Sequence, residues 1–283
     1  MKYVLIRDDD INYFTKTEWL EDLYGPLLER GLPVNLSVIP RTKCNLPLGD
    51  PRSIYRAREH MENEPFIPPE WRGKGDEFET GENRRLVDFL RSFSNIEVAQ
   101  HGFAHEYVRG EREFASNDIN YLDGRIRGGR DMLKKAFGRD VNFFVSPWDY
   151  LSGTALMRLK KAGFLGISLY KVFREMRPPF FQSLFSCREK GALSIFGKFL
   201  IVTHPGYLFS RFNAASEIRD RVDEALAKAD VVVVVNHHWE YFFDWGGRDE
   251  VFFNTWTTFR DDLLKRDDIE FLNFTTLYHR TVG

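Results

Sequence analysis

The sequence predicts an α/β fold built around a buried parallel sheet, and three observations indicate it. Short apolar segments alternate with amphipathic ones along nearly the whole chain, in the order strand then helix. The apolar segments are almost continuous, as in the VVVVV of residues 231–235, which is typical of strands covered on both faces. The length of 283 residues lies near the roughly 250 residues of a single α/β barrel. We therefore expect one domain over residues 1–283.

Each expected element follows from its local pattern. In order, strands are expected at residues 4–6, 33–40, 96–99, 141–145, 165–169, 199–202, 231–235 and 269–274. Helices are expected at residues 17–30, 82–90, 118–137, 154–162, 214–229 and 249–265. Closed into a barrel, this order places every strand C-terminus on one rim, where barrel enzymes hold their active sites. An open doubly wound sheet has the same local pattern, but no GxGxxG motif follows the first strand to favour it.

Residues 41–81 interrupt the alternation. This segment is polar, contains several prolines and has no sustained periodicity, so we expect an inserted loop here. Loops of this length in a compact domain are usually functional or disordered. The segment could therefore be a lid over a site, and an ill-ordered excursion is equally consistent with its composition.

Composition excludes several classes of protein. Forty Lys and Arg residues against 42 Asp and Glu residues give a formal charge of −2, so no bulk field favours nucleic acid or anionic lipid. No apolar run approaches the roughly 20 residues of a membrane span. The N-terminal MKYVLIRDDDINYF lacks the pattern of a signal peptide, which favours the cytoplasm. Cys44 and Cys187 form no CxxC motif, so a metal site would rely on histidine and carboxylate ligands.

Polar residues gather where the expected strands end. They are Asp8, Asp9 and Asp10 after the first strand, His101 and His105 after the third, Pro147 and Trp148 after the fourth, His204 after the sixth, and His237 and His238 after the seventh. Taken singly, an aspartate run is typical of a solvated turn, and a strand-end histidine of a hydrogen-bonded structural residue. Their gathering on one rim instead favours a functional site.

The spacing of His101 and His105 decides whether they could share a metal ion. In an extended strand the two residues would lie about 13 Å apart, too far for bonds of about 2.0–2.1 Å to one ion. At helical spacing their Cβ atoms would approach to about 5–6 Å. We therefore expect the chain to turn helical directly after the strand. Gly102 stands where an HExxH metalloprotease has its glutamate, so that class is excluded.

An open catalytic site needs a third protein ligand, and Asp10 is the candidate. Asp9 would then be the base that takes a proton from the attacking water. Strict strand alternation would instead place Asp8 and Asp10 on one face, so the spacing leaves the roles of the three aspartates open.

Together these segments resemble the polysaccharide deacetylase superfamily, the NodB-homology carbohydrate esterases. IRDDDI (6–11) resembles the first motif, whose paired aspartates act as base and metal ligand, and HGFAH (101–105) resembles the HxxxH metal motif. FVSPW (144–148) resembles the segment that usually reads Arg-Pro-Pro-Tyr, and the strand ending at His237 resembles the motif whose histidine protonates the leaving group. LPVNLSVIP (32–40) and EFLNF (270–274) resemble the second and the closing strands.

The resemblance implies a distorted (β/α)7 barrel of the glycoside hydrolase/deacetylase type and a metal-dependent hydrolase. It implies Asp10, His101 and His105 as metal ligands, Asp9 as base and His237 as the acid. The expected substrate-binding residues are Pro147, Trp148, His238 and Trp239. A backbone N–H near Pro147 or Trp148 would bind the oxyanion, His238 is an alternative acid, and either tryptophan could stack on a sugar or simply pack. Zn²⁺ is the expected metal, with Co²⁺, Ni²⁺ and Mn²⁺ as alternatives.

The sequence departs from the family pattern at four places. Ile11 replaces the glycine after the aspartates, and Gly102 replaces the usual Ser or Thr. The arginine that usually begins the Arg-Pro-Pro-Tyr segment is missing from residues 144–148, and Arg7 is a substitute by proximity in sequence alone. The Asp-Trp motif that positions the acid also has no clear counterpart, although residues 203–207, around His204, could supply a missing component or form a turn.

Three functions therefore compete. The leading one is removal of an N-acyl group, acetyl first, from an amino sugar, nucleotide sugar or lipid-linked glycan in the cytoplasm, for instance in lipopolysaccharide or O-antigen biosynthesis. The second is a catalytically inactive carbohydrate-binding barrel that retains the metal site. The third is a phosphoesterase on the same rim, which would need two metal ions about 3.5–4 Å apart.

Overall fold

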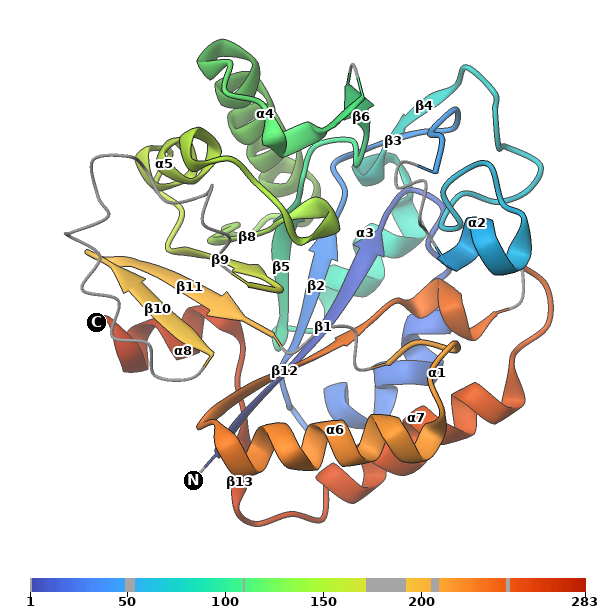
Figure 1. Cartoon of the computed structure of the whole chain (residues 1–283), viewed down its shortest axis with the longest axis vertical. Helices are drawn as coiled ribbons and strands as arrows, with labels where there is room; N and C mark the ends of the chain where they lie inside the picture. The colour runs from blue at the N-terminus through green and yellow to red at the C-terminus, as the bar shows by residue number, and fades with distance from the viewer. Residues whose placement is uncertain (1, 49–53, 109, 172–191, 205–208, 243–244) are drawn as a thin grey trace.

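The computed structural model describes residues 2–48, 54–108, 110–171, 192–204, 209–242 and 245–283. Within these residues, neighbouring parallel strands form a sheet that curves into an incomplete barrel (Figure 1). In spatial order the parallel strands are β11 (Phe199–Thr203), β9 (Gly166–Leu169), β8 (Phe143–Val145), β5 (Ile96–His101), β2 (Val34–Val38), β1 (Lys2–Ile11) and β12 (Val231–Asn236). The order confirms the distorted (β/α)7 barrel, which stays unpaired between β11 and β12 in the described part of the chain.

Amphipathic helices cover the outside of this barrel. They are α1 (Thr17–Leu28), α3 (Arg84–Ser92), α4 (Ile119–Phe137), α5 (Gly153–Lys161), α6 (Ala215–Lys228) and α7 (Glu250–Leu263). α4 begins at the Asp118 cap, which accepts two backbone N–H groups, and ends at Gly138 in the left-handed conformation, as expected. In the described ranges, each helix is either too short or too polar to traverse a lipid bilayer.

Side chains alternate between the two faces of the sheet, and this alternation positions the site. In β12, Val232 and Val234 pack outward with the helices, whereas Val233 and Val235 belong to a second cluster inside the barrel. In β1, Leu5 lies in the interior cluster. Arg7, two residues further on, has the same orientation, so the barrel interior becomes polar near the C-terminal ends of the strands.

The closing segment differs from the expected strand at residues 269–274. β13 (Ile269–Phe271) pairs with the start of β1 and stops there. Asn273 then caps α8 (Phe274–Thr281), whose Phe274 packs on Phe143 inside the barrel. The apolar run was therefore a short strand followed by a helix that closes the N-terminal end of the barrel. β10 (Leu193–Phe196), antiparallel to β11, was not predicted.

Residues 41–81 carry short elements of their own. β3 (Arg41–Lys43) pairs with β4 (Glu77–Glu79), and α2 (Ile54–Glu59) lies between them in sequence. These elements lie at the end of the molecule to which β1 and β2 point (Figure 1). Phe78 stacks on Tyr13, which follows β1, with 4.3 Å between the ring centroids. The segment is thus packed against the barrel in its described part, and its role as a lid stays a prediction.

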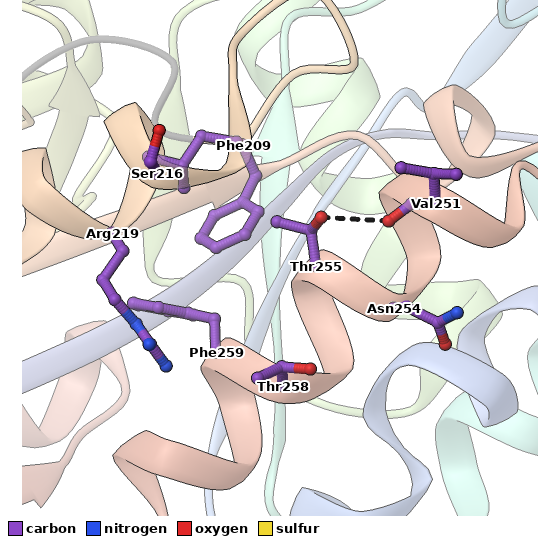
Figure 2. Close-up of a pocket in the computed structure, with 9 residues that line it drawn as sticks. Phe209, Ser216, Arg219, Val251, Asn254, Thr255, Thr258 and Phe259 are labelled. Carbon is purple, nitrogen blue, oxygen red and sulfur yellow. Dashed lines mark hydrogen bonds between the residues drawn. The ribbon is translucent and has the colours of Figure 1, made fainter.

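A groove of about 500 Å³ lies outside the barrel, between α6 and α7 (Figure 2). Its apolar lining includes Phe209, Ile218, Val251 and Phe259. None of these residues belongs to the strand-end site described next.

Candidate metal centre

A bulge at the end of β1 separates the three aspartates. The pairing of β1 with β2 shifts between Asp8 and Ile11, and Asp10 has a φ of 64°. Asp8 therefore turns away from Asp10 and bonds to the hydroxyl of Tyr24 and to His238. Regular alternation, which would have placed Asp8 beside Asp10, does not hold here.

The HxxxH segment follows β5 as an irregular turn rather than a helix. Gly102 and His105 both have left-handed backbone, with φ values of 62° and 50°. These two residues reverse the chain tightly enough to bring the centroids of the His101 and His105 rings within 5.1 Å. The expected strand-to-helix junction is wrong. The irregular turn nevertheless brings the two imidazoles close together, which is the result expected from helical spacing.

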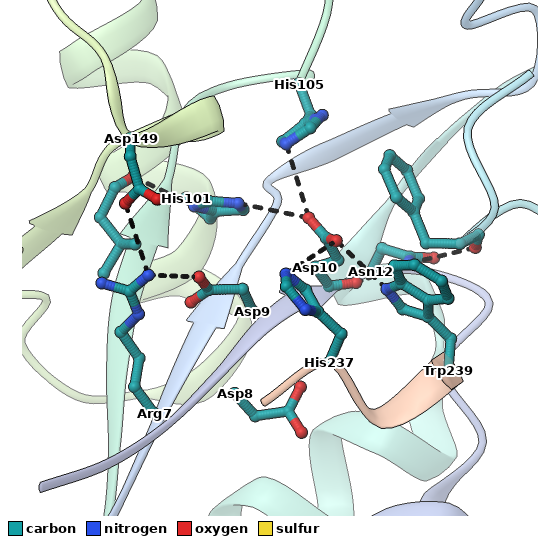
Figure 3. Close-up of polar contacts among 12 residues, drawn as sticks. Arg7, Asp8, Asp9, Asp10, Asn12, His101, His105, Asp149, His237 and Trp239 are labelled. Carbon is teal, nitrogen blue, oxygen red and sulfur yellow. Dashed lines mark hydrogen bonds and ion pairs between the residues drawn. The ribbon is translucent and has the colours of Figure 1, made fainter. Parts of the chain in front are cut away.

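Asp10, His101 and His105 come together at the strand ends (Figure 3). Asp10 Oδ1 lies 3.3 Å from His101 Nε2 and 3.5 Å from His105 Nε2. One ligand atom from each residue falls within 4.8 Å of the others, and the three residues are at most 5% exposed. Within the described residues, this is the one cluster of three or more such groups, which gives no support to a two-metal site.

The chemistry of these donors fits a cation. His101 Nδ1 lies 3.1 Å from the carbonyl of Val145, and donation to that oxygen leaves Nε2 with a free lone pair. Burial lowers the pKa of His105 to about 3, so its ring is neutral. Asp10 Oδ1 is buried with no hydrogen-bond partner among the described residues. A buried carboxylate oxygen facing two imidazole nitrogens is the donor set of a divalent metal.

Asp9 is held by a buried ion pair with Arg7, which is 1% exposed. The distance from Arg7 Nη2 to Asp9 Oδ2 is 2.6 Å, while Nη1 donates to the hydroxyl of Ser168 at 2.9 Å. Arg7 also lies 3.6 Å from Asp149, which bonds to His204 at 3.0 Å. Arg7 thus contacts Asp9 from within β1 itself, although the motif that usually carries this arginine lacks one. Residues 205–207 of the segment considered for a missing component lie outside the described residues.

His237 faces the same centre from the end of β12. Its Nε2 is 3.8 Å from Asp10 Oδ2, and its Nδ1 is 3.3 Å from Glu240. Burial by itself lowers the pKa of His237, but Glu240, Asp10 and Asp9 outweigh it and raise the pKa to about 9. His237 is therefore protonated near neutrality. Glu240 is thus a carboxylate partner of this histidine.

The four residues expected to bind substrate differ from one another in exposure and contacts; they are Pro147, Trp148, His238 and Trp239. His238 is fully buried, with Nδ1 against Asp8 and Nε2 against the Thr15 hydroxyl, so it has no free face for a substrate or a leaving group. Trp239 is 6% exposed and donates its indole N–H to Asp10 at 3.1 Å, which orients a metal ligand rather than offering a stacking surface.

Pro147 and Trp148 lie beside the turn that carries His105. Pro147 is buried against Gly102. Trp148 is partly exposed, and its ring centroid lies 4.1 Å from that of His105 and 4.6 Å from that of Tyr107. Its φ of 49° is an unusual backbone conformation for a bulky residue at the edge of a site. Trp148 is thus the one tryptophan of the two that can meet a substrate here.

Sequence reasoning did not find Asp149, Glu240 or Glu113, all buried carboxylates near the site. Glu240 could have been noticed, because it stands three residues after His237 in a short 3-10 turn (His238–Tyr241). Asp149 and Glu113 gave no such signal, because their partners are distant in sequence or are backbone groups.

No protein-family model matches the sequence, and no curated protein matches it. Solved structures do share its fold. A putative polysaccharide deacetylase from Mycobacterium smegmatis aligns with a TM-score of 0.57 at 12% identity, covering 99% of this chain and 90% of that one. A CE4 family pseudoenzyme from Bacillus anthracis aligns with a TM-score of 0.53 at 11% identity, covering 98% of this chain and 65% of that one.

A family 4 acetyl xylan esterase from Clostridium thermocellum, in complex with a cobalt ion, aligns with a TM-score of 0.50 at 12% identity. The alignment covers 99% of this chain and 91% of that one. At identities this low the likeness establishes the fold, and it confirms the fold that the resemblance of the motifs implied.

Proposed function

We propose that this protein is a metal-dependent hydrolase that removes an N-acyl group, acetyl first, from an amino sugar. The observation that carries the proposal is the buried Asp10, His101 and His105 cluster beside a separate carboxylate, Asp9, that Arg7 holds in place. In a hydrolase of this kind the metal ligand and the base must be different groups. The bulge in β1 separates two adjacent residues, so that Asp10 can act as a ligand and Asp9 as the base.

The residues of the chain divide the chemistry among them. A divalent cation held by Asp10, His101 and His105 would supply Lewis acidity toward water and the acyl carbonyl. Asp9 Oδ2 is bound by Arg7, whereas Asp9 Oδ1 has no hydrogen-bond partner among the described residues and can accept the proton of the attacking water. His237, backed by the Glu240 carboxylate, donates a proton to the departing amine.

Arg7 contributes by orienting the base. Its guanidinium bridges Asp9 and Ser168, so the Asp9 carboxylate is fixed relative to the barrel interior before a substrate arrives. We expect turnover to fall when this orientation is lost.

The polysaccharide deacetylase and acetyl xylan esterase among the structural neighbours support a carbohydrate substrate. We take an N-acetylated sugar, free or as a nucleotide sugar or glycan, as the substrate class and surface-polysaccharide biosynthesis in the cytoplasm as the setting. Zn²⁺ is the first candidate metal, and the cobalt ion in one neighbour supports Co²⁺ as a probe.

The test is to load purified protein with Zn²⁺ or Co²⁺ and incubate it with a panel of N-acetylated sugars, nucleotide sugars and oligosaccharides. Acetate and free amine should appear in equal amounts, and Asp9→Asn protein prepared in parallel should release both more slowly, by about 100-fold or more. Absence of release from the whole panel by metal-loaded protein would contradict the proposal, and sugar binding without release would identify an inactive binding barrel instead.

A further inference from the structure

A buried carboxylate, Glu113, holds the backbone of the HxxxH turn. Glu113 begins the short 3-10 turn Glu113–Ala115 and is 1% exposed. Its oxygens accept the backbone N–H groups of three successive residues, Phe103 at 3.2 Å, Ala104 at 3.2 Å and His105 at 3.1 Å. Successive N–H groups that converge in this way form a concave site for an anion. Here the anion comes from the chain itself.

The carbonyl groups of the same turn also have defined partners. Gln100 donates its side-chain amide to the carbonyl of Gly102 at 2.8 Å, and the N–H of Arg41 donates to the carbonyl of Phe103 at 3.0 Å. Hydrogen bonds therefore fix both the N–H groups and the carbonyl groups of the backbone between His101 and His105. Removing Glu113 would leave buried N–H groups unpaired, so the turn would have to change its conformation.

Gly102 allows the carboxylate to approach. A Cβ atom at this position would lie 2.5 Å from Pro147 Cγ and 2.8 Å from Glu113 Oε2, and the φ of 62° is one that glycine adopts without strain. This explains why glycine stands where the family pattern has Ser or Thr. The hydroxyl of such a residue is absent, and Glu113 supplies the hydrogen bonds to the turn.

Arg125 of α4 supplies the charge that balances Glu113. Its Nη1 lies 2.8 Å from Glu113 Oε1, and its guanidinium stacks over Phe103 with 5.1 Å from Cζ to the ring centroid. Arg125 also pairs with Glu106, which Lys43 of β3 contacts at 2.5 Å. The turn is thus held between a helix on one side and residues 41–43 on the other.

We propose that Glu113 is a positioning residue for the metal centre, acting through the backbone of residues 103–105 to aim His101 and His105 at one ion. The inference rests on the proposed metal site. Glu113 is not one of the three candidate ligands, so its effect is on the geometry and affinity of the ligand set. Partners of this kind, one step removed from the metal, are typically worth about 10–100-fold in metal affinity.

The experiment measures Co²⁺ binding by titration of the full-length metal-free protein, with the visible spectrum of bound Co²⁺ as a report of ligand geometry. Glu113→Gln keeps the size of the side chain but loses its charge and turns an amide group toward the N–H donors. We expect Co²⁺ affinity to fall by about tenfold or more and the spectrum to change.

Glu97→Gln is the matched control. Like Glu113, Glu97 is a buried carboxylate that accepts a backbone N–H group, but it lies on β5 and its donor is Thr275 at the start of α8. Its affinity and spectrum should equal those of the unaltered protein. An equal loss of affinity in both variants would overturn the inference, because the effect would then follow from replacing any buried glutamate of the barrel by glutamine.

Two further outcomes distinguish a failure of this inference from a failure of the proposed metal site. Unaltered protein that binds no Co²⁺ would overturn both, whereas Glu113→Gln protein that binds Co²⁺ within twofold of the unaltered protein would overturn only the role of Glu113. If circular dichroism shows that Glu113→Gln does not fold, Glu113→Asp keeps the charge but shortens the side chain, so that the carboxylate cannot reach all three N–H groups. Unchanged Co²⁺ affinity in Glu113→Asp would equally contradict the inference.

Discussion

Asp8, Asp9 and Asp10 have the same side chain and adjacent positions, yet each has a different partner. Asp8 bonds to Tyr24 and His238 in the protein interior, Asp9 to Arg7, and Asp10 faces the two histidines. Burial makes each carboxyl group dependent on its own partner, since a buried polar group without a partner is costly. A single residue change at this strand end should therefore alter one function at a time.

The metal ligands and the base should separate on substitution. Asp10→Ala or His105→Ala removes a donor from a three-ligand set, so metal uptake should be abolished. Asp9→Asn leaves the ligand set whole and should retain the ion while turnover falls by about 100-fold or more. Elemental analysis of the purified variants and an acetate-release assay measure the two effects. Stoichiometric metal in both ligand variants would refute the assignment.

Arg7→Lys should lower turnover without changing metal content. The guanidinium donates to Asp9 and to Ser168 from two different nitrogens. A lysine ammonium has one nitrogen and cannot reproduce this geometry. We expect kcat to fall by about tenfold or more, since Asp9 is no longer fixed in orientation. Ser168→Ala is the control that removes one partner of Arg7 but leaves the ion pair with Asp9, and it should have a smaller effect. Equal activity of Arg7→Lys and unaltered protein would exclude an orienting role.

At the scale of elements, side chains tie strands to the helix that closes the barrel. Glu97 of β5 accepts the N–H and the hydroxyl of Thr275 at 2.9 and 2.8 Å, at the first turn of α8. Asn35 of β2 accepts the N–H of Phe274 at 2.9 Å. These bonds lie at the opposite end of the strands from the metal centre, so they affect stability rather than chemistry.

Glu97 should make folding stability depend on pH. Burial raises the pKa of Glu97 to about 7, against the opposing hydrogen bonds of Thr275 and Phe274. Since the folded state holds this proton more tightly than the unfolded chain, the stabilisation is complete below the unfolded pKa and is lost as the pH rises through about 7. The loss amounts to about 3 kcal/mol at most.

Urea unfolding at about pH 5 and pH 8 measures this effect. The free energy of unfolding of the unaltered protein should fall over this range by more than that of Glu97→Gln, whose amide can keep one bond to each group of Thr275. Identical pH dependence in the two proteins would contradict the raised pKa.

At the scale of the whole molecule, the metal centre joins segments that are far apart in the chain. Its candidate ligands lie at the ends of β1 and β5, and His237 and Trp239 follow β12. A cation that bound only the folded state would therefore oppose global unfolding. Because the centre spans strands from both halves of the sequence, this stabilisation should not be confined to one region.

Addition of Zn²⁺ or Co²⁺ should raise the unfolding temperature of the metal-free protein by several degrees. A ligand at 100 times its Kd stabilises the folded state by about 2.7 kcal/mol. Differential scanning calorimetry with and without the ion measures the shift, and Asp10→Ala protein should show none. A shift of the same size in Asp10→Ala would mean that the ion acts elsewhere.

The sequence by itself determined the order of strands and helices, because apolar periodicity and helix caps such as Asp118 and Gly138 act within a few residues. It also determined the types of residue at the strand ends, and hence a site that combines aspartate with histidine. Motif spacing singled out His101 and His105, whereas the choice of Asp10 among the three aspartates came from the resemblance to a known family and not from spacing.

Only the tertiary structure decided how those residues meet. The bulge that separates Asp8 from Asp10 depends on pairing with β2, and the turn that joins His101 to His105 depends on Glu113, which comes from a later segment. The contact of Arg7 with Asp9 and Ser168, and the burial of His238 on Asp8, follow from strands that lie side by side only in the folded barrel. Local patterns cannot contain these contacts, since their energy comes from groups that are distant in sequence.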